Sequence, residues 1–385
     1  MIKRMFLALL RSELCQEAVS ADIASTISAD TLKPLYSISK SHDLTHFIAQ
    51  ALHKLGALGD DEVSAKFNNS SMSAVMRYQR INYEYNRICA AFEAAGIDYI
   101  PLKGSVIREH YATPWMRTSC DIDILVREEA VDSAYILLTE KLSYKGDQNR
   151  NFHDVSMFSP SGVHLELHFN IKEGIEPMDS VLSRVWECSS KVDTTAHKYL
   201  QSDEFLVFHI IAHAAYHFMA GGCGIRPFRD LWLLKRDLKL DSEKLDALLS
   251  EAGLQIFARE MILLSDVLFG DAKHNEVTQN MLDYILGAGV YGTLENKVAM
   301  SRKNDSGAVY LWLRIFLPLR TLQNLYPRLG KYPVLYPFYT VKRWFKILFK
   351  HDKSRVINEI KYNATLTDDR QRYIAELKNS LGINK

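Results

Sequence analysis

The predicted fold of this chain rests on three segments, which read Ile100-Pro101-Leu102-Lys103-Gly104-Ser105, Asp121-Ile122-Asp123-Ile124-Leu125-Val126 and Val163-His164-Leu165-Glu166-Leu167-His168. The first segment has the composition of a strand, a glycine turn and the start of a helix. The other two alternate polar and apolar residues with the period of a strand. Together they predict a small α/β core in which two strands carry carboxylates on one face.

The carboxylates of the second and third segments predict a metal site. Alternate side chains on a strand share a face, so Asp121 and Asp123 point the same way. Two carboxylates one pleat apart repel each other and resist burial, and a divalent cation removes that conflict. Mg²⁺ takes oxygen ligands and often lies between carboxylates and substrate phosphates. With Glu166 on a neighbouring strand, we predict that Asp121, Asp123 and Glu166 hold Mg²⁺ or Mn²⁺.

The turn at Lys103-Gly104-Ser105 leads into an expected helix over Val106–Tyr111. The first backbone N–H groups of a helix attract an anion, and glycine lets a phosphate come close. A phosphate cradle followed by Asp-x-Asp predicts a nucleoside triphosphate with its metal. Lys103, Gly104 and Ser105 are therefore candidate nucleotide-binding residues, with Gly104 and Ser105 expected at the β- and γ-phosphates.

The order of these segments resembles the DNA-polymerase-beta-like nucleotidyltransferase superfamily, in which a third acidic residue follows the Asp-x-Asp strand. The closer resemblance is to the bacterial uncharacterised nucleotidyltransferase family. Its members carry Leu-Lys-Gly, an Arg ahead of Asp-x-Asp-Leu-Val, and a Glu-Leu-His strand. The matching residues here are Leu102-Lys103-Gly104, Arg117, Asp121–Val126 and Glu166-Leu167-His168. The superfamily often has two small residues at the turn, and the first of them is Lys103 in this chain.

The resemblance implies an α+β fold, with a nucleotidyltransferase-like small mixed sheet and flanking helices between helical N- and C-terminal regions. It implies transfer of an NMP group from a nucleoside triphosphate, with ATP as the expected donor, to a hydroxyl of a small molecule, sugar or peptide. Asp121, Asp123 and Glu166 would be the catalytic residues. Two alternatives stay open: a non-catalytic nucleotide-binding or scaffold protein of this fold, and a phosphotransferase that uses the same metal site.

The histidines beside Glu166 allow a second interpretation. A His-x-Glu-x-His strand could itself bind a transition metal. We favour Glu166 as the ligand, His168 as its support or as a substrate contact, and His164 as a structural residue.

Arg117 is also a candidate nucleotide-binding residue, because its guanidinium fork suits phosphate oxygens. The alternative role for Arg117 is that of a buried partner for the aspartates.

Three further residues are substrate-pocket candidates. A helix is expected over Phe205–Phe218, and four-residue spacing puts His213 on one face with the histidines one turn before and after it. In the resembled family this helical region packs over the nucleotide site, so His213, Arg229 and Asp230 become candidates. A structural Arg–Asp pair is the alternative for Arg229 and Asp230.

Composition excludes several classes of protein. The chain has 385 residues, 47% of them apolar and 24% charged, which is ordinary for a globular protein of two or three domains. Its net charge of +1 does not favour a sequence-specific nucleic-acid binder. The five cysteines are scattered and include no C-x-x-C, which indicates a reducing, cytoplasmic compartment. The apolar run within Met1–Leu10 is too short for a signal peptide, and no segment has the length of a membrane span.

Four regions are expected along the chain. They are a helical N-terminal region at 1–95, the α/β core at 96–175, a helical domain covering the site at 176–305, and an aromatic and basic helical region at 306–385.

The last region contains an expected helix, Val341–Lys350, in which Trp344 and Phe345 stand among lysines. Such a helix suits a membrane interface or a cap over the domain with its lysines in water. We favour the cap, with peripheral membrane contact as the alternative.

Overall fold

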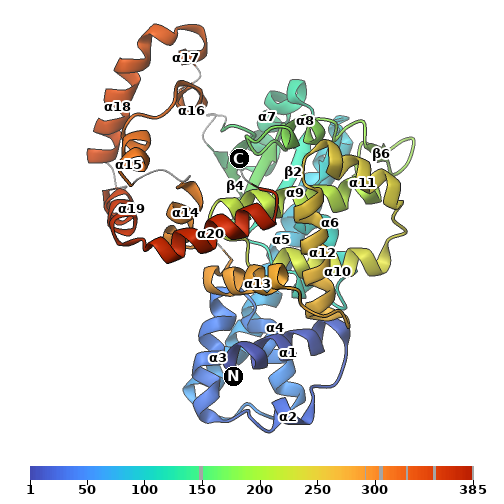
Figure 1. The fold of residues 1–385 in the computed structure, drawn as a ribbon. Coiled ribbons are helices and arrows are strands. Elements are labelled where there is room, and N and C mark those ends of the chain that lie inside the picture. Colours follow the sequence, from blue (N-terminus) through green and yellow to red (C-terminus); the bar gives the residue numbers. More distant parts are fainter. Residues whose placement is uncertain (147–150, 291, 303–306, 327, 350–352, 384–385) are drawn as a thin grey trace.

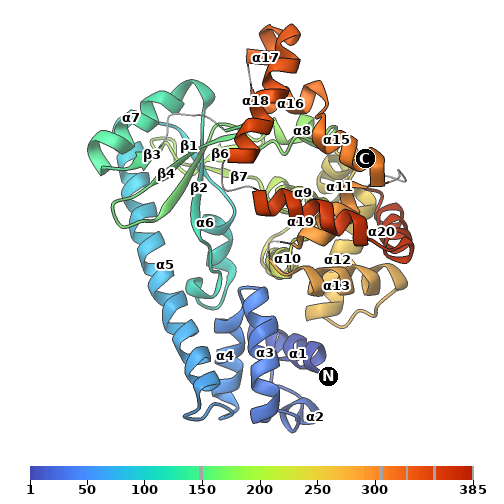
Figure 2. The same cartoon turned by 90° about the vertical axis from the view of Figure 1, so that its left-hand side faces the viewer.

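The computed structural model describes residues 1–385 except 147–150, 291, 303–306, 327, 350–352 and 384–385. Five helices precede the sheet: α1 (Ile2–Cys15), α2 (Ala21–Ala24), α3 (Ala29–Ser41), α4 (Thr45–Lys54) and α5 (Glu62–Ala95). The side chain of Asp61 caps the start of α5, and Gly96 ends it in the left-handed conformation. With 34 residues, α5 runs from the N-terminal helices to the sheet (Figure 2).

A five-stranded mixed sheet forms the centre of the fold, as predicted. Its elements are β1 (Tyr99–Pro101), α6 (Gly104–Ile107), the 3-10 helices η1 (Arg108–His110) and η2 (Pro114–Met116), β2 (Asp121–Val126), η3 (Glu128–Ala130), α7 (Val131–Leu142), β3 (Lys145–Gly146), β4 (Asp154–Phe158) and β5 (His164–His168). The strand order is β1-β2-β5-β4-β3. Only β2 and β5 pair in parallel among these neighbours, and this pairing sets the two acidic strands side by side.

Helices cover the other side of the site. The elements that follow the sheet are α8 (Met178–Leu182), β6 (Ser189–Lys191), β7 (Tyr199–Gln201), α9 (Asp203–Met219), α10 (Arg226–Asp237), α11 (Ser242–Glu251), α12 (Gln255–Phe269) and α13 (Glu276–Ala288). Helix α9 is buried along most of its length, which explains why its sequence is apolar on nearly every side. Its few polar positions therefore mark the places where it faces something other than core.

The rest of the chain begins with α14 (Leu294–Ser301) and ends with α19 (Lys353–Thr365) and α20 (Asp368–Ser380). Between them lie α15 (Gly307–Ile315), α16 (Leu319–Leu325), α17 (Arg328–Lys331), η4 (Pro333–Leu335) and α18 (Tyr336–Phe349). We call residues 307–349 the arm, because α15 to α18 stand apart from the body in Figure 1. Lys350, the last residue of the helix expected at 341–350, lies outside the described residues.

Three hydrophobic clusters hold these parts together. The largest joins the N-terminal helices to α8–α13 and α20, so the first and third expected regions share one core. A second lies between the sheet and the helices α5 and α7. A third, small cluster lies inside the arm, around Leu317, Leu322, Leu329 and Tyr339.

The architecture confirms the predicted α+β class, with a small mixed sheet between helical regions. Among the described residues, no helix has the length and apolar character needed to cross a bilayer.

Candidate functional site

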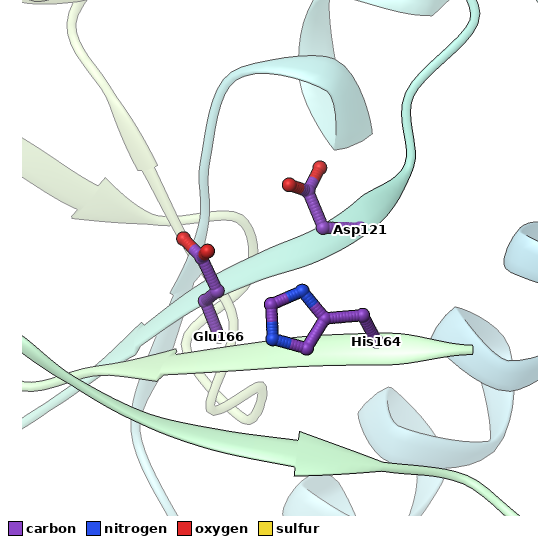
Figure 3. A group of neighbouring side chains, drawn as sticks. All are labelled: Asp121, His164 and Glu166. Atoms are coloured by element: carbon purple, nitrogen blue, oxygen red, sulfur yellow. The ribbon is translucent and has the colours of Figure 1, made fainter. Parts of the chain in front are cut away.

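The acidic side chains lie on β2 and β5, at the parallel pair in the middle of the sheet. Asp121 is in register with His164, and Asp123 with Glu166. Figure 3 shows Asp121 on β2 and His164 and Glu166 on β5 extending to the same side of the sheet. The alternation that predicted this shared face is therefore correct for both strands.

Asp121 occupies an electrostatically unfavourable position. No described residue donates a hydrogen bond to its carboxylate, and Asp123 and Glu166 lie near it. Burial, together with the charges of Asp123 and Glu166, raises the pKa of Asp121 to about 6. The Asp121 carboxylate would thus be stabilised by any cation that enters the site.

Asp123 is in the opposite situation. Its Oδ1 lies 3.3 Å from the Lys103 ammonium and 3.0 Å from Nε2 of His168. Burial alone would raise the pKa of Asp123, but Lys103 and His168 hold it well below its usual range. Burial likewise opposes the charge on His168, yet its contacts with Asp123 and Glu166 raise the pKa of His168 to about 9. Lys103 and His168 therefore balance the buried charge of Asp123.

The donor set fits a divalent cation. The structure brings together two groups of possible ligands, Asp121 with His164 and Glu166, and Asp123 with Glu166 and His168. Within each group the ligand atoms lie within 4.8 Å of one another. Carboxylate oxygens dominate both groups, which favours hard cations such as Mg²⁺ or Mn²⁺. Asp121 fits best, because its carboxylate forms no ion pair with a described residue, and the nearby carboxylates and burial outweigh the charge of Lys103.

Lys103 adopts a backbone conformation that is rare for a residue with a side chain, with φ at +44°. The Lys103 side chain reaches Asp123, so the strain is offset by an ion pair in the site. Gly104 packs closely, since a Cβ there would lie 3.4 Å from Cβ of Ser119. The Ser105 amide already donates to the carbonyl of Leu102.

A pocket of about 420 Å³ opens over the acidic face of the sheet. Its lining includes the expected residues Lys103, Gly104, Arg117, Asp121, Asp123, Glu166, His168, His213 and Asp230. Ser105 and Arg229 are not among the lining residues. Nine of the expected site residues, spread along the chain from Lys103 to Asp230, thus meet at one cavity, which lies between the sheet on one side and α9 and α10 on the other.

Arg117 is fixed by Asp230. Its Nε donates to both carboxylate oxygens of Asp230, at 2.9 and 3.0 Å, and Nη2 lies 2.8 Å from Oδ2. The Tyr111 hydroxyl donates to the same carboxylate at 2.6 Å, and Nη1 of Arg117 donates to the carbonyl of Thr118. Arg117 is therefore a buried partner of an aspartate, as the alternative role supposed, but that aspartate comes from α10 and not from β2.

Arg229 does not form the Arg–Asp pair considered from the sequence. It is fully buried, and its guanidinium lies over the rings of Phe47 and Tyr111, 4.6 and 5.5 Å from their centroids. No described residue accepts a hydrogen bond from its guanidinium nitrogens. These contacts join α10 to Phe47 of α4 and to Tyr111 directly after η1, which indicates a packing role for Arg229.

The histidines of α9 form a hydrogen-bonded chain at the wall facing the carboxylates. Nδ1 of His213 lies 2.6 Å from Oε1 of Glu173, and Nε2 of His213 lies 3.1 Å from Nε2 of His217. Burial, aided by the Lys103 charge, lowers the pKa of His213 well below its usual value. Burial and the His213 charge lower the pKa of His217 to about 3. Both rings are neutral at pH 7, so His213 donates to Glu173 and accepts from His217.

Several lining residues were not predicted from the sequence, namely Ser119, Lys172, Glu173, Cys223 and Arg226. They lie in loops or at helix starts, where no periodicity marks them. Arg226 donates to Asp43, 183 residues away, so only the folded chain reveals it as part of the wall.

Comparison with known proteins gives one match. The family model described as "Uncharacterised nucleotidyltransferase" matches residues 29–270, which contain the sheet and most of the pocket lining. No curated protein and no solved structure matches the chain. The matched part is well over half of the chain, and it includes both acidic strands and the wall of α9 and α10. The chain therefore belongs to the uncharacterised nucleotidyltransferase family.

Proposed function

We propose that the protein is a metal-dependent enzyme that moves an NMP group from a nucleoside triphosphate to a hydroxyl of an acceptor. The observation that carries this proposal is the meeting of Asp121, Asp123 and Glu166 at the floor of one pocket with basic residues around it. In the reaction, the acceptor hydroxyl attacks the α-phosphate and pyrophosphate leaves. ATP is the donor we expect.

Asp121, Asp123 and Glu166 would hold Mg²⁺ or Mn²⁺. When bound, the metal neutralises the charge that develops on the attacking and leaving oxygens. Asp121 provides a ligand without an ion-pair contact to a described residue, whereas Asp123 contacts both Lys103 and His168. Glu166 lies on the strand next to both aspartates, where it could serve as a further ligand or take the acceptor proton.

The phosphates would lie against Lys103, Gly104 and Ser105. Lys103 supplies a buried cation at the edge of the pocket, and the charges of Asp123 and Glu173 raise its pKa against the effect of burial. Gly104 lines the pocket and has no side chain to obstruct a phosphate. Ser105 does not line the pocket, so its hydroxyl is proposed only from its place in the sequence, directly after Gly104. Arg117 also lines the pocket and adds positive charge, while Asp230 fixes the orientation of its guanidinium.

The acceptor would enter on the opposite side, against α9. This wall carries Glu173, whose pKa burial raises, and the neutral rings of His213 and His217, which could pass a proton to it along their hydrogen bonds. His168 and Asp230 complete the lining between the two sides. We assign Arg229 no contact with the substrates. Its packing against Phe47 and Tyr111 supports the position of α10.

Metal-dependent binding is the first test. Calorimetry with ATP should give binding in Mg²⁺ or Mn²⁺ and none in EDTA, because Asp121, Asp123 and Glu166 repel the triphosphate when no cation is present. Equal affinity in the two conditions would remove the metal from the proposal.

The transfer itself is tested with triphosphates labelled at the α-phosphate, incubated with Mg²⁺ and cell lysate. We expect labelled acceptor and pyrophosphate from the wild type. The variant Glu166→Gln should bind ATP but transfer at least a hundredfold more slowly, in line with the usual effect of losing a proton-transfer group or metal ligand. Glu140→Gln, an exposed change on α7, is the matched control.

The same reaction separates the alternatives. Label that stays on the nucleoside while a γ-phosphate moves would indicate a phosphotransferase. Tight metal-dependent binding of every triphosphate without any product would indicate a nucleotide-binding scaffold. Full turnover by Glu166→Gln would place the chemistry outside the acidic strands.

A further inference from the structure

Exposed large apolar side chains are far denser along the arm than along the rest of the described chain. Between Val309 and Phe345 there are more exposed large apolar side chains than among all described residues before them. They include Trp312, Val334, Phe338 and Phe345, which are 62, 83, 61 and 57% exposed. Such a concentration of exposed apolar side chains in one segment is typical of an interaction site in a folded protein.

The same segment carries charge of a single sign. From Gly307 to Phe349 the sequence has no Asp or Glu, and its basic residues are Arg314, Arg320, Arg328, Lys331, Lys342, Arg343 and Lys346. Arg314 is paired with Glu359 of α19. Arg320, Arg328, Lys331, Lys342 and Lys346 form no ion pair with any described residue. Because the whole chain has a net charge of only +1, the arm is a basic part on an otherwise acidic protein.

Helix α18 combines the two properties on one face. Phe338, Val341 and Phe345 are exposed and follow the i, i+3, i+7 spacing of a helical stripe. Lys342 and Lys346 are exposed beside them. The opposite side of α18 packs inward through Tyr339 and through Trp344, whose Nε1 donates to the carbonyl of Ile315. The helix thus has the inward contacts expected of a cap, and a second apolar face that those contacts leave exposed.

We propose that the arm docks the protein on an anionic lipid leaflet. The apolar side chains of α15, η4 and α18 would enter the boundary between headgroups and acyl chains, and Lys342 and Lys346 would meet the phosphates. The uniform positive charge argues against a second copy of the same face, because two such faces repel. Most of the exposed residues are aliphatic, which argues against a single-stranded nucleic acid, whose bases stack on rings.

The experiment uses the full chain and sedimentation with vesicles, without nucleotide. We expect at least tenfold more protein bound to vesicles of phosphatidylcholine with 30% phosphatidylglycerol than to vesicles of phosphatidylcholine alone. Binding should fall markedly in 0.5 M NaCl, because salt screens the attraction between the basic arm and the anionic headgroups.

Two variants test the two properties of the arm. Lys342→Glu/Lys346→Glu should bind at least fivefold more weakly, and Phe338→Ser/Phe345→Ser should lose as much or more. Matched controls are Lys33→Glu/Lys40→Glu, exposed lysines on α3, and Met76→Ser/Ile136→Ser, exposed apolar residues on α5 and α7. The controls should bind vesicles like the wild type, and circular dichroism melting checks that all four variants fold.

Three results would overturn the proposal. The wild-type protein could stay in the supernatant, it could bind both kinds of vesicle equally, or the arm variants could bind as well as the control variants. A dimer in light scattering that the arm variants lose would assign the surface to a second copy. Binding of single-stranded RNA, without vesicle binding, would assign it to nucleic acid. The outcome does not depend on the proposed transfer reaction, because Asp121→Asn should bind vesicles like the wild type.

Discussion

Asp121 and Asp123 stand two residues apart on β2, yet their surroundings act on them in opposite directions. Burial and two nearby carboxylates disfavour the charge of Asp121, and its pKa rises to about 6. Lys103 and His168 favour the charge of Asp123, and its pKa falls well below the usual range. The two residues should therefore differ in their effect on stability, although they share a face and a proposed role.

Exchange of each aspartate for asparagine tests this difference. At pH 7.5 without metal, Asp121→Asn should stabilise the protein by about 1–3 kcal/mol, because it removes a carboxylate whose ionised form is disfavoured in the fold. Asp123→Asn should destabilise it by about 2–4 kcal/mol, because it leaves Lys103 and His168 buried without their partner.

The measurement is urea unfolding, together with calorimetry of ATP and Mg²⁺ binding. Both variants should lose metal-dependent binding of ATP, so a change in stability can be separated from a change in function. If both variants lose stability to the same extent, the electrostatic description of the site is incorrect.

At the scale of single residues, the sequence predicted side chains on regular elements better than those that meet across the fold. Strand alternation placed Asp121, Asp123 and Glu166 on one face because the period of a strand is fixed. Arg229 and Asp230 were considered as a pair, but neighbours on a helix point in directions about 100° apart and do not face each other. The partner of Asp230 is Arg117, 113 residues earlier, and no local pattern contains that information.

The element that completes the pocket is α9. Its histidines follow a four-residue spacing, and the sequence indicated that they share a face. The structure adds that this face meets Glu173 from the loop after β5. The resulting chain from His217 through His213 to Glu173 gives the wall of the pocket a group that can accept a proton, opposite the carboxylates that would hold the metal.

Substitution on α9 tests the proposed acceptor side. His213→Gln keeps polarity and size but cannot pass a proton on to Glu173, so transfer should slow by at least tenfold, toward the usual effect of losing a proton-transfer group. ATP affinity in Mg²⁺ should change by less than about twofold, because the proposed phosphate contacts are Lys103, Gly104 and Ser105 and not His213.

His209→Gln is the control for this change, one turn earlier on the same helix. His209 contacts Gln201 and not Glu173, so its loss should leave the transfer rate within about threefold of the wild type. Rates are measured as pyrophosphate release with the acceptor that the labelling experiment identifies. Equal losses in the two variants, or weaker ATP binding in His213→Gln, would show that α9 only packs against the site.

At the scale of the whole molecule, the sequence predicted the α+β class and the position of the sheet, because local patterns determine both. The sequence could not show that the N-terminal helices and α8–α13 share one hydrophobic core. That contact joins residues far apart in the chain, and it depends on the direction in which α5 runs from the N-terminal helices to the sheet. Hydrophobic spacing in α18 likewise indicated an amphipathic helix, but one amphipathic pattern cannot tell which of two apolar faces is buried.

The joint between these parts contains buried histidines that should make the whole fold sensitive to acid. His42 and His46 lie where the N-terminal helices meet the rest, and Nε2 of His46 lies 3.0 Å from the carbonyl of Met116. Burial is the main cause that lowers the pKa of each to about 4, and the charge of Arg229 adds to it. In the unfolded chain both would titrate near pH 6.5.

The sign of the effect follows from proton uptake. Between pH 6.5 and 4, His42 and His46 bind protons in the unfolded state but not in the folded state. The free energy of unfolding therefore falls as the pH falls through this window. Each of the two histidines should cost about 1 kcal/mol of unfolding free energy between pH 7 and pH 5.5. Asp121, with its raised pKa, acts in the opposite direction, and comparison of variants with the wild type removes its contribution.

Urea unfolding of His46→Gln at pH 7 and pH 5.5 tests this argument. The glutamine amide can still donate to the Met116 carbonyl but does not titrate, so this variant should lose about 1 kcal/mol less than the wild type when the pH falls. His53→Gln, an exposed change on the same helix, should lose as much as the wild type. If His46→Gln has the same pH dependence as His53→Gln, the acid sensitivity arises elsewhere, and the joint between the N-terminal helices and the catalytic core does not depend on a neutral His46.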